Sequence, residues 1–245
     1  MNIVDTTVAW LTNAAHWQGA TGIPARLVEH VALSSVSLAI ALAIGLPIGL
    51  WIGHTGRAAT LAVNLANVGR ALPSLAVIAL VLPTTQALDP QLGFTVYPTL
   101  IGMVVLAVPP ILVNAYAGLA SVDRELIEAG RGTGMRERQL LTRVELPLAV
   151  PVIVAGIRSA AVQIIATATL GAIFGFGGLG RYLVDGYAQR DDGQIFGGVF
   201  LVAGLAITTE IAFAILQRTL TSRGLRLEQE RARMEVANRE GVWAG

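Results

Sequence analysis

Very few side chains in this sequence could carry out chemistry. The chain has no cysteine, its 17 basic residues are all arginine, and its three histidines, His16, His30 and His54, stand far apart. A catalytic nucleophile needs a base within hydrogen-bond reach, a metal ion needs several ligands close together, and a phosphate-binding loop of the Walker type needs a lysine. The sequence predicts none of these. We therefore expect a protein that is not an enzyme, holds no metal or cofactor, and leaves any ATP chemistry to a partner.

The most regular spacing of polar and small residues lies in the interval Ser121–Pro147, between two long apolar runs. Here three residues separate Glu128-Ala129-Gly130 from Gly134, and nine more separate Gly134 from Val144-Glu145-Leu146-Pro147. Asp123 is a good N-cap and Glu125 lies in the positive first turn, so a short helix is expected to begin at Arg124. Gly130, Gly132 and Gly134 weaken that helix and let the backbone turn. The interval therefore predicts a helix-turn-helix elbow.

This elbow has features of a contact surface for another protein. Small residues at Ala129, Gly130 and Gly134 would let a partner's groove approach the backbone, with Glu128 and Arg131 at the rim of the contact. Pro147 suits the first turn of a helix, so Leu146 and Pro147 would fix the angle at which the chain enters the next apolar run. An ordinary solvated loop rich in arginine is the alternative interpretation.

The elements around the elbow are those of a membrane protein. Of 245 residues 54% are hydrophobic and only 13% are charged, which is too apolar for a soluble domain. Hydrophobic runs long enough to span a bilayer predict an all-α bundle of about five transmembrane helices and leave no room for a large soluble domain. The five expected spans are 27–53, 58–82, 98–120, 147–173 and 194–217.

The segments between and beside the spans have distinct expectations. Residues 1–24 carry Trp10 and Trp17 around a short apolar patch, which predicts an interfacial helix with its tryptophans at headgroup depth, a span at the lipid edge being the alternative. Pro73 and Ser74 should break the second span, and residues 84–97 should form a polar loop. The glycine-rich residues 171–193 predict an irregular or re-entrant segment that continues as a wet loop. The tail alternates arginine and glutamate and predicts a solvated helix.

A few polar residues lie inside the spans. Arg70, Arg158 and Glu210 are charged, and such residues within a span are costly unless paired or facing water. Pairing of Glu210 with Arg70 or Arg158 would offset the cost of both charges. For Arg70 we favour a structural role over a place on a solute pathway. Asn114, Gln163 and Thr167 are neutral polar groups on the third and fourth spans. We take them as candidates for a weak solute path.

The arginines predict how the chain is oriented. Arg57, five arginines of the elbow interval and six from Arg218 to Arg239 fall on one side of the expected bundle, whereas Arg26, Arg181 and Arg190 fall on the other. The side with more arginine is expected to be cytoplasmic. The elbow and the C-terminal tail would then lie in the cytoplasm and the N-terminus outside. The formal net charge of +1 gives no reason to expect nucleic acid as a partner.

The elbow spacing resembles the EAA loop of permease subunits from bacterial ATP-binding-cassette importers, with Gly130 in place of alanine and Val144 in place of isoleucine. Further motifs in the family's order make the chain resemble MetI-like permeases, above all those for osmoprotectants such as glycine betaine, choline, carnitine or proline. These motifs are Arg70–Leu75, Pro109–Asn114, Ala155–Arg158, Ala166–Leu170 and Gly175–Gly180.

The resemblance implies how such a subunit works. Two permeases, either identical or sister subunits, would pair in a bacterial cell membrane, each docking its elbow on a cytoplasmic subunit that binds ATP and Mg²⁺. An external substrate-binding protein or lipoprotein would deliver the solute. Glu128, Ala129, Gly130, Arg131 and Gly134 would couple the ATPase to the bundle, and Leu146 and Pro147 would hold the lever's angle.

The implied organisation is an N-terminal external or interfacial segment 1–26, a type-1 transmembrane domain 27–220 and a charged cytoplasmic tail 221–245. A methionine-type amino-acid permease has a similar layout and is the first alternative. An ion-coupled carrier without an ATPase, with Arg70, Arg158 and Glu210 as a charge relay, is the second. The elbow would have no purpose in such a carrier, and no internal repeat is evident in the sequence.

Overall fold

The computed structural model describes residues 2–221 and residue 224, with the backbone alone at positions 61, 62, 65, 66, 68 and 70. Every regular element in this part of the chain is helical, as the sequence predicts. The expected tail 221–245 lies outside the described residues except for Thr221 and Gly224. The helices are α1 (Ile3–Thr12), η1 (Ala14–Trp17), α2 (Ile23–Thr55), α3 (Ala59–Ala71), α4 (Ser74–Leu88), α5 (Leu92–Ala120), α6 (Arg124–Gly132), α7 (Glu137–Leu140), η2 (Leu141–Glu145), α8 (Leu146–Ala168), η3 (Thr169–Phe174), α9 (Gly180–Gln189) and α10 (Asp192–Leu220).

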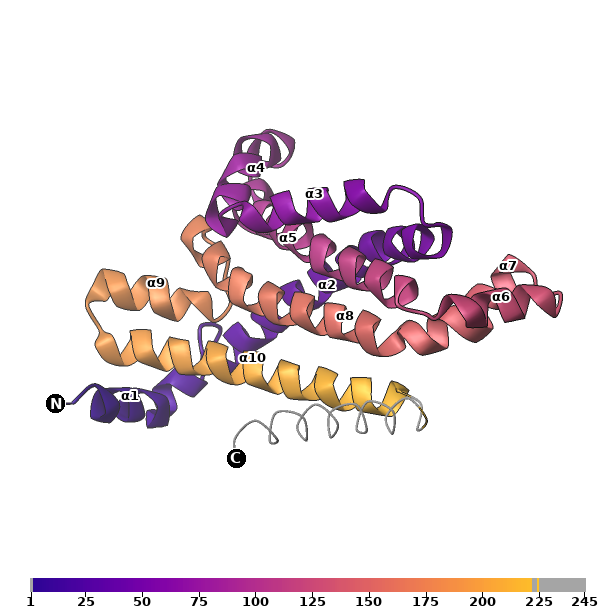
Figure 1. Cartoon of the computed structure of the whole chain (residues 1–245). Helices are drawn as coiled ribbons and strands as arrows, with labels where there is room; N and C mark the ends of the chain where they lie inside the picture. Colours follow the sequence, from indigo (N-terminus) through magenta and orange to yellow (C-terminus); the bar gives the residue numbers. More distant parts are fainter. Residues whose placement is uncertain (1, 222–223, 225–245) are drawn as a thin grey trace, which may run out of the picture.

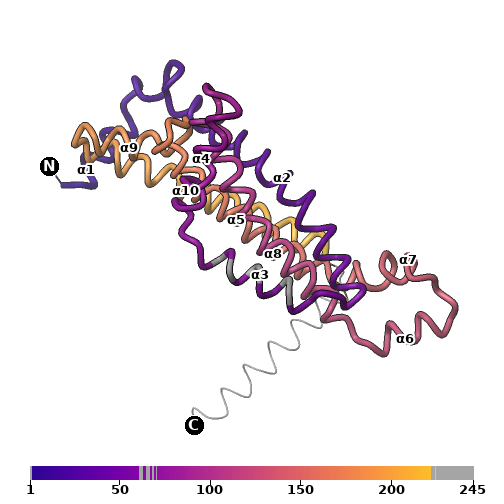
Figure 2. The backbone as a smooth tube through the Cα atoms, turned by 90° about the horizontal axis from the view of Figure 1, so that it is seen from above, coloured from indigo at the N-terminus to yellow at the C-terminus, as the bar shows by residue number. Residues whose placement is uncertain are grey.

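Long helices give the molecule an elongated shape. Four helical stretches of the described chain are long and apolar enough to cross a membrane: Ile23–Thr55, Leu92–Ala120, Glu137–Phe174 and Asp192–Leu220. They run along the long dimension of the bundle, with α6 and α7 projecting beyond one end and α1 and α9 at the other (Figures 1 and 2). We call these the elbow end and the α9 end. The chain is thus a multi-pass membrane protein.

The second expected span is divided into α3 and α4. Leu72 adopts an extended conformation with φ −75° and ψ 130°, because the ring of a following proline disfavours the helical conformation. The break at Pro73 confirms the predicted one. The prediction of a polar loop at 84–97 is wrong, since α4 continues to Leu88 and α5 begins at Leu92. Asp89 makes this short connection possible by accepting the backbone N–H groups of Gln91 and Leu92 at 2.8 and 3.0 Å.

The main core lies where α2, α5 and α8 pack together. Met103, Ala107 and Ile111 of α5 meet buried residues of α2 and α8 there. A stripe of Gly45, Gly49 and Gly53 on α2 faces α5 and brings the two backbones close. Gly156 of α8 faces Asn114 and the Pro110 carbonyl of α5 in the same way. Small residues therefore set the spacing of this three-helix core.

The N-terminal segment is partly as expected. α1 is a helix of 10 residues, about 15 Å long and therefore too short to span a bilayer. Its Trp10 is 7% exposed and packs with Tyr182, Leu179 and Ile23, so its ring lies inside the protein, while the expected headgroup depth stays a prediction. Glycines at 193 and 197 on α10 leave the space for it, because a Cβ at either position would contact Trp10. Trp17 is half exposed.

The glycine-rich segment is irregular over a shorter stretch than predicted. Residues 175–179 form a loop in which Gly175 and Gly178 have positive φ angles of 79° and 72°. The wet loop expected after it is wrong, because residues 180–189 form α9. This helix packs on α10 and buries Tyr182, while an Arg181–Asp185 pair one turn apart lies on its surface.

Candidate functional site

The first arm of the elbow, helix α6, begins as the sequence predicts. Asp123 caps it, with Oδ1 accepting the Glu125 N–H at 2.9 Å. Glu128 and Ala129 lie on the exposed surface, and the Glu128 side chain is 67% exposed beside Arg124 at 3.5 Å. An exposed ion pair of this kind contributes little to stability. Glu128 and Ala129 therefore contribute little to the stability of the elbow.

The turn after α6 explains the position of Gly134. The Met135 N–H donates to Gly130 O at 3.1 Å and the Gly134 N–H donates to Arg131 O at 2.9 Å, which is the Schellman arrangement at the end of a helix. This arrangement places Gly134 in the left-handed region at φ 82°. A Cβ on Gly134 would meet no atom within 4 Å, so the residue is open on the surface of the elbow.

Gly130 has a different place from the one we expected. It is buried, and a Cβ there would come 2.8 Å from Leu140 Cδ1 in the second arm. Its small size therefore serves packing inside the elbow. Among the predicted coupling residues of the elbow, four are exposed on its surface: Glu128, Ala129, Arg131 and Gly134.

The second arm runs into the transmembrane helix through a widened turn. Helix α7 is followed by η2, a π-helical turn in which the Leu146 N–H donates to Leu141 O, five residues back. Such turns are rare and often mark functional positions. Leu146 packs beside Leu119, Ala149 and Ile153, and Pro147 lies exposed in the first turn of α8, as predicted for a proline. The second arm of the elbow and α8 thus form one continuous helical stretch, which begins at Glu137.

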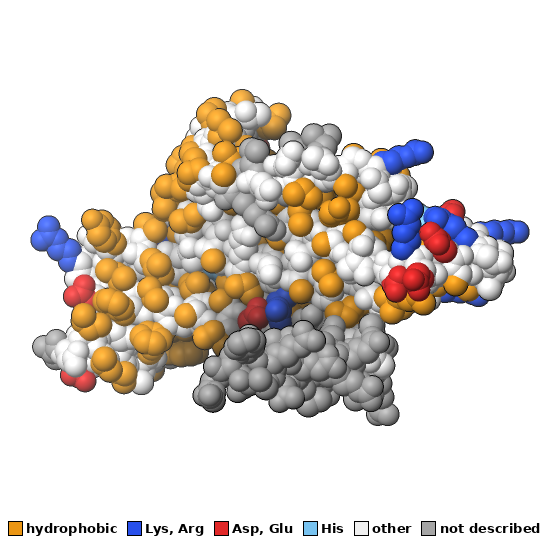
Figure 3. Space-filling model, in the orientation of Figure 1, with side chains coloured by type: hydrophobic (Ala, Val, Ile, Leu, Met, Phe, Trp, Pro, Cys, Tyr) orange, Lys and Arg blue, Asp and Glu red, His pale blue; other side chains and the backbone are white. Residues whose placement is uncertain are grey.

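Acidic and basic side chains tie the two arms of the elbow to each other. Arg131 donates two hydrogen bonds to the Glu137 carboxylate, at 3.1 and 3.2 Å, and these hydrogen bonds raise the pKa of Arg131. Figure 3 shows that blue and red side chains gather at the two ends of the molecule and are densest over the elbow. The surface between the ends is mostly orange and white.

Two side chains that the sequence did not single out lie behind the elbow. His54, in the last turn of α2, has Nδ1 2.6 Å from Glu145 Oε2 and Nε2 3.5 Å from Glu137 Oε2. The His54 and Glu145 side chains are only 16% and 4% exposed. The sequence held one weak indication of a buried charge, since Glu145 is an acid placed directly before an apolar run. Its partner is 91 residues away, and no local pattern joins the two.

The structure pairs two of the three charges inside the spans. Arg158 Nε on α8 lies 3.3 Å from Glu210 Oε1 on α10, with the two side chains 30% and 48% exposed. The Arg70 side chain lies outside the described residues, so its partner stays open. Of the two pairings considered for Glu210, the one with Arg158 is therefore present.

We expect the variant Glu210→Ala to be less stable than the double variant Arg158→Ala, Glu210→Ala, because the single change leaves Arg158 unpaired among apolar helices. A lone charge at the centre of a span costs about 2.5–3.5 kcal/mol on insertion scales, and the partial exposure of this pair places the effect at or below the lower figure. Thermal unfolding of the purified protein in detergent measures it. Equal losses in Tm for the single and double variants would show that the pair is not coupled.

The three polar residues proposed for a pathway are spread along the bundle. Asn114 lies beside Gly156 and donates its Nδ2 to Pro110 O at 2.7 Å. Along α8, Gln163 is about 10 Å and Thr167 about 16 Å further than Gly156. Thr167 is buried inside the subunit, whereas Gln163 is half-buried. The structure does not gather these three residues into one site, and their role remains a prediction.

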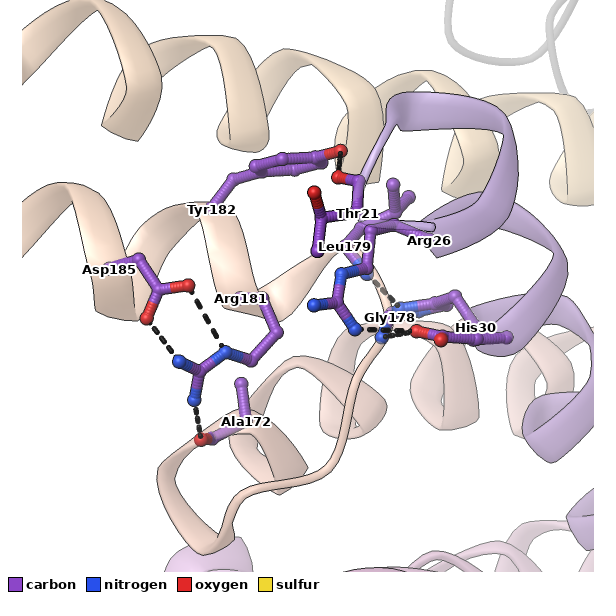
Figure 4. A network of polar contacts seen from close by, with 10 residues as sticks. Thr21, Arg26, His30, Ala172, Gly178, Leu179, Arg181, Tyr182 and Asp185 are labelled. Atoms are coloured by element: carbon purple, nitrogen blue, oxygen red, sulfur yellow. Dashed lines mark hydrogen bonds and ion pairs between the residues drawn. The ribbon is translucent and has the colours of Figure 1, made fainter. Parts of the chain in front are cut away.

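A second polar network holds the glycine loop at the α9 end (Figure 4). Glu29 Oε2 accepts the Gly178 N–H at 2.7 Å and the Arg26 guanidinium at 2.9 Å. His30 Nδ1 accepts the Leu179 N–H at 3.3 Å, while its Nε2 lies 3.1 Å from Ile165 O. The Tyr182 hydroxyl donates to Thr21 O at 2.9 Å. Residues at the start of α2 therefore anchor the loop between α8 and α9, a link that the sequence did not predict.

Known proteins share both this sequence and this architecture. Residues 45–226 match the family described as "Binding-protein-dependent transport system inner membrane component". The carnitine transport permease protein OpuCB of Listeria monocytogenes is 36% identical over 200 residues, which cover 82% of this chain and 88% of the relative. The choline transport system permease protein OpuBB of Bacillus subtilis is 34% identical, with 82% and 90% covered. The osmoprotectant import permease protein OsmW of Salmonella typhimurium is 32% identical over 91% of this chain and 100% of its own length.

Solved structures agree on the fold. A chain of the MetNI methionine ABC transporter in an inward-facing conformation superposes with a TM-score of 0.71 at 24% identity, covering 82% of this chain and 97% of that chain. At this identity the likeness concerns the fold alone. The family match and the relatives at 32–36% identity establish the family as well as the fold. The chain belongs to the family of inner membrane components of binding-protein-dependent transport systems.

Proposed function

We propose that this chain is the permease subunit of an ATP-driven importer for a small quaternary-amine osmoprotectant, with carnitine, choline and glycine betaine as the first candidates. The observation that carries the proposal is the family match over residues 45–226 together with relatives named for these solutes. Aromatic faces recognise quaternary ammonium groups, and the chain has few aromatic residues, 6% of its length. Selection of the solute therefore falls to an external binding protein, and the permease offers only a weak path.

The elbow is the proposed contact with a cytoplasmic ATPase subunit that carries ATP and Mg²⁺. Its projection from one end of the bundle and the exposure of Glu128, Ala129, Arg131 and Gly134 support this role. The arginines concentrated at that end support a cytoplasmic orientation, which would place the C-terminus in the cytoplasm and the α9 end outside. Because the elbow continues directly into α8, closure of the ATPase pair would rock the bundle and alternate its access.

A second permease, identical or a sister subunit, is the proposed partner in the membrane. The Arg158–Glu210 pair supports this, because partly exposed charges in mid-span belong against protein or a water-filled path rather than against lipid. The division into segment 1–26, transmembrane domain 27–220 and tail 221–245 stands as part of the same proposal, with the first span already beginning at Ile23.

Uptake of radiolabelled solutes tests the function. The chain is expressed with its ATPase and binding-protein subunits in cells that lack their own importers, and glycine betaine, choline, carnitine, proline and methionine are compared. We expect accumulation of at least one quaternary amine, and none when the ATPase subunit is disabled. Accumulation of methionine alone would assign the chain to amino-acid import. Uptake that continues without a working ATPase would favour the ion-coupled carrier.

A further inference from the structure

His54 lies at the junction of three elements at the elbow end. Through Nδ1 it contacts Glu145 at 2.6 Å, in the π-helical turn before α8, and through Nε2 it faces Glu137 at 3.5 Å, in α7. Glu137 in turn holds Arg131 of α6 by two hydrogen bonds. One imidazole at the end of α2 is thus connected to both arms of the elbow through charged side chains.

The burial of Glu145 makes the contact with His54 strong. A carboxylate that is 4% exposed has lost almost all of its water, and among the described residues it is His54 that stands within ion-pair distance of it. The Nδ1–Glu145 contact is a hydrogen bond, whereas the Nε2–Glu137 contact at 3.5 Å is a longer approach to a second carboxylate. Removal of either partner leaves the other buried without compensation.

The position of this contact gives it mechanical importance. Apart from this contact, the elbow is joined to the bundle by its covalent ends at α5 and α8 and by apolar packing of Leu141 against the cluster that contains Leu119 and Ala149. His54 adds an attachment to α2, whose other end carries Glu29 and His30 at the glycine loop (Figure 4). The 26 residues from Glu29 to His54 form one continuous helical segment about 37 Å long, with Pro47 inside it. Through this attachment, a movement of the elbow would pass directly to α2 and along it to the α9 end.

We propose that His54 is a positioning residue that clamps the elbow to α2 through Glu145 and Glu137 and transmits elbow movement to that helix. The inference rests on the proposed function in one respect, that the elbow receives the movement of the ATPase. The clamp itself is a property of this chain alone. It can therefore be tested separately from transport.

The clamp is tested by a distance measurement on the full chain in lipid nanodiscs. Because the chain has no cysteine, two introduced cysteines, at the exposed positions Thr133 in the elbow and Trp51 on α2, are enough for spin labelling. Labelled chain is diluted with unlabelled chain so that distances within one subunit dominate. We expect a narrow distance distribution with His54, a distribution at least twice as wide in His54→Leu and in the isosteric Glu145→Gln, and a return toward the original width in His54→Arg, whose guanidinium can bond two carboxylates.

Coupling is measured on the complete transporter in proteoliposomes, as solute imported per ATP hydrolysed. We expect His54→Leu to lower this ratio at least fivefold while ATP hydrolysis continues, and His54→Arg to restore much of it. Arg57→Gln is the matched control, since it removes a positive charge from an exposed residue at the same end and should leave both readouts unchanged.

Three other outcomes are possible, and each contradicts a different part of the proposal. Unchanged distance distributions in both His54→Leu and Glu145→Gln would show that the clamp does not exist. A wider distribution with an unchanged import-to-ATP ratio would show that the clamp does not transmit movement. If import does not depend on ATP even with His54 in place, the proposed function fails, and the distance measurement still reports on the clamp.

Discussion

Replacing Glu128 by arginine and Gly134 by tryptophan together is expected to abolish solute import by the assembled transporter while the permease remains in the membrane. Both residues lie on the open surface of the elbow, where Glu128 is 67% exposed and Gly134 has no atom near its missing Cβ. A charge reversal at a protein interface costs several kcal/mol, which corresponds to a loss of about 100-fold or more in affinity. Tryptophan adds a bulky ring to a surface that a partner would approach closely.

Import of the radiolabelled solute and co-purification of the ATPase subunit measure this loss. Two single changes separate contact from folding. Glu128→Arg leaves the turn intact and should alone remove most of the import. Gly134→Asn introduces a residue that tolerates the left-handed conformation at φ 82°. The elbow should therefore stay folded in this variant, and import should be largely normal. Import that survives the double change would mean that Ser121–Pro147 is an ordinary loop, as the alternative interpretation holds.

Gly49→Leu is expected to prevent stable packing of α2 against α5. A Cβ at Gly49 would lie 2.5 Å from Leu112 O and 2.7 Å from Ala115 Cβ, and the first of these atoms is backbone that no side-chain rotation can move. Overpacking of a core costs about 1–3 kcal/mol, and more when whole elements must separate. Since Met103, Ala107 and Ile111 belong to the same core, the separation would loosen the centre of the bundle.

The thermal unfolding midpoint and the yield of monodisperse protein in detergent report this effect. Gly204→Leu is the matched control, because Gly204 lies on α10 and a Cβ added there would have no atom within 4 Å. We expect the control to unfold near the temperature of the parent protein and Gly49→Leu to unfold well below it or to aggregate. Similar midpoints for the two variants would contradict the close approach of α2 and α5.

Much of the fold could be predicted because its signals are local. An apolar run long enough for a bilayer identifies its own span, and a proline disturbs the helix at the residue before it, so the bundle and the break at Pro73 followed from the sequence. Asp123 caps α6 by bonding to a backbone group two residues away. The Gly134 position in the turn and the elbow spacing are likewise properties of a short stretch. These same local patterns carried the resemblance to importer permeases.

The errors in the prediction concern contacts between distant segments. Trp10 and Tyr182 were expected in polar surroundings, yet they pack on each other with ring centroids 5.1 Å apart, although they lie far apart in the sequence. Gly130 was expected on the open surface of the elbow but packs on Leu140 inside it, and its role in coupling stays a prediction. In both cases the residue type was compatible with either environment, and only the arrangement of neighbouring helices decided between them.

The sequence by itself determined that the chain crosses a membrane, where its elbow lies and which family it resembles, since hydrophobic length and motif spacing are read along the chain. Only the tertiary structure decided that Glu210 pairs with Arg158, that Glu29 holds the glycine loop, and that His54 joins Glu145 behind the elbow. A charged side chain in a low-dielectric interior needs a partner, but the sequence does not say which one. The partner is fixed by the packing of helices that small residues such as Gly49 and Gly156 bring together.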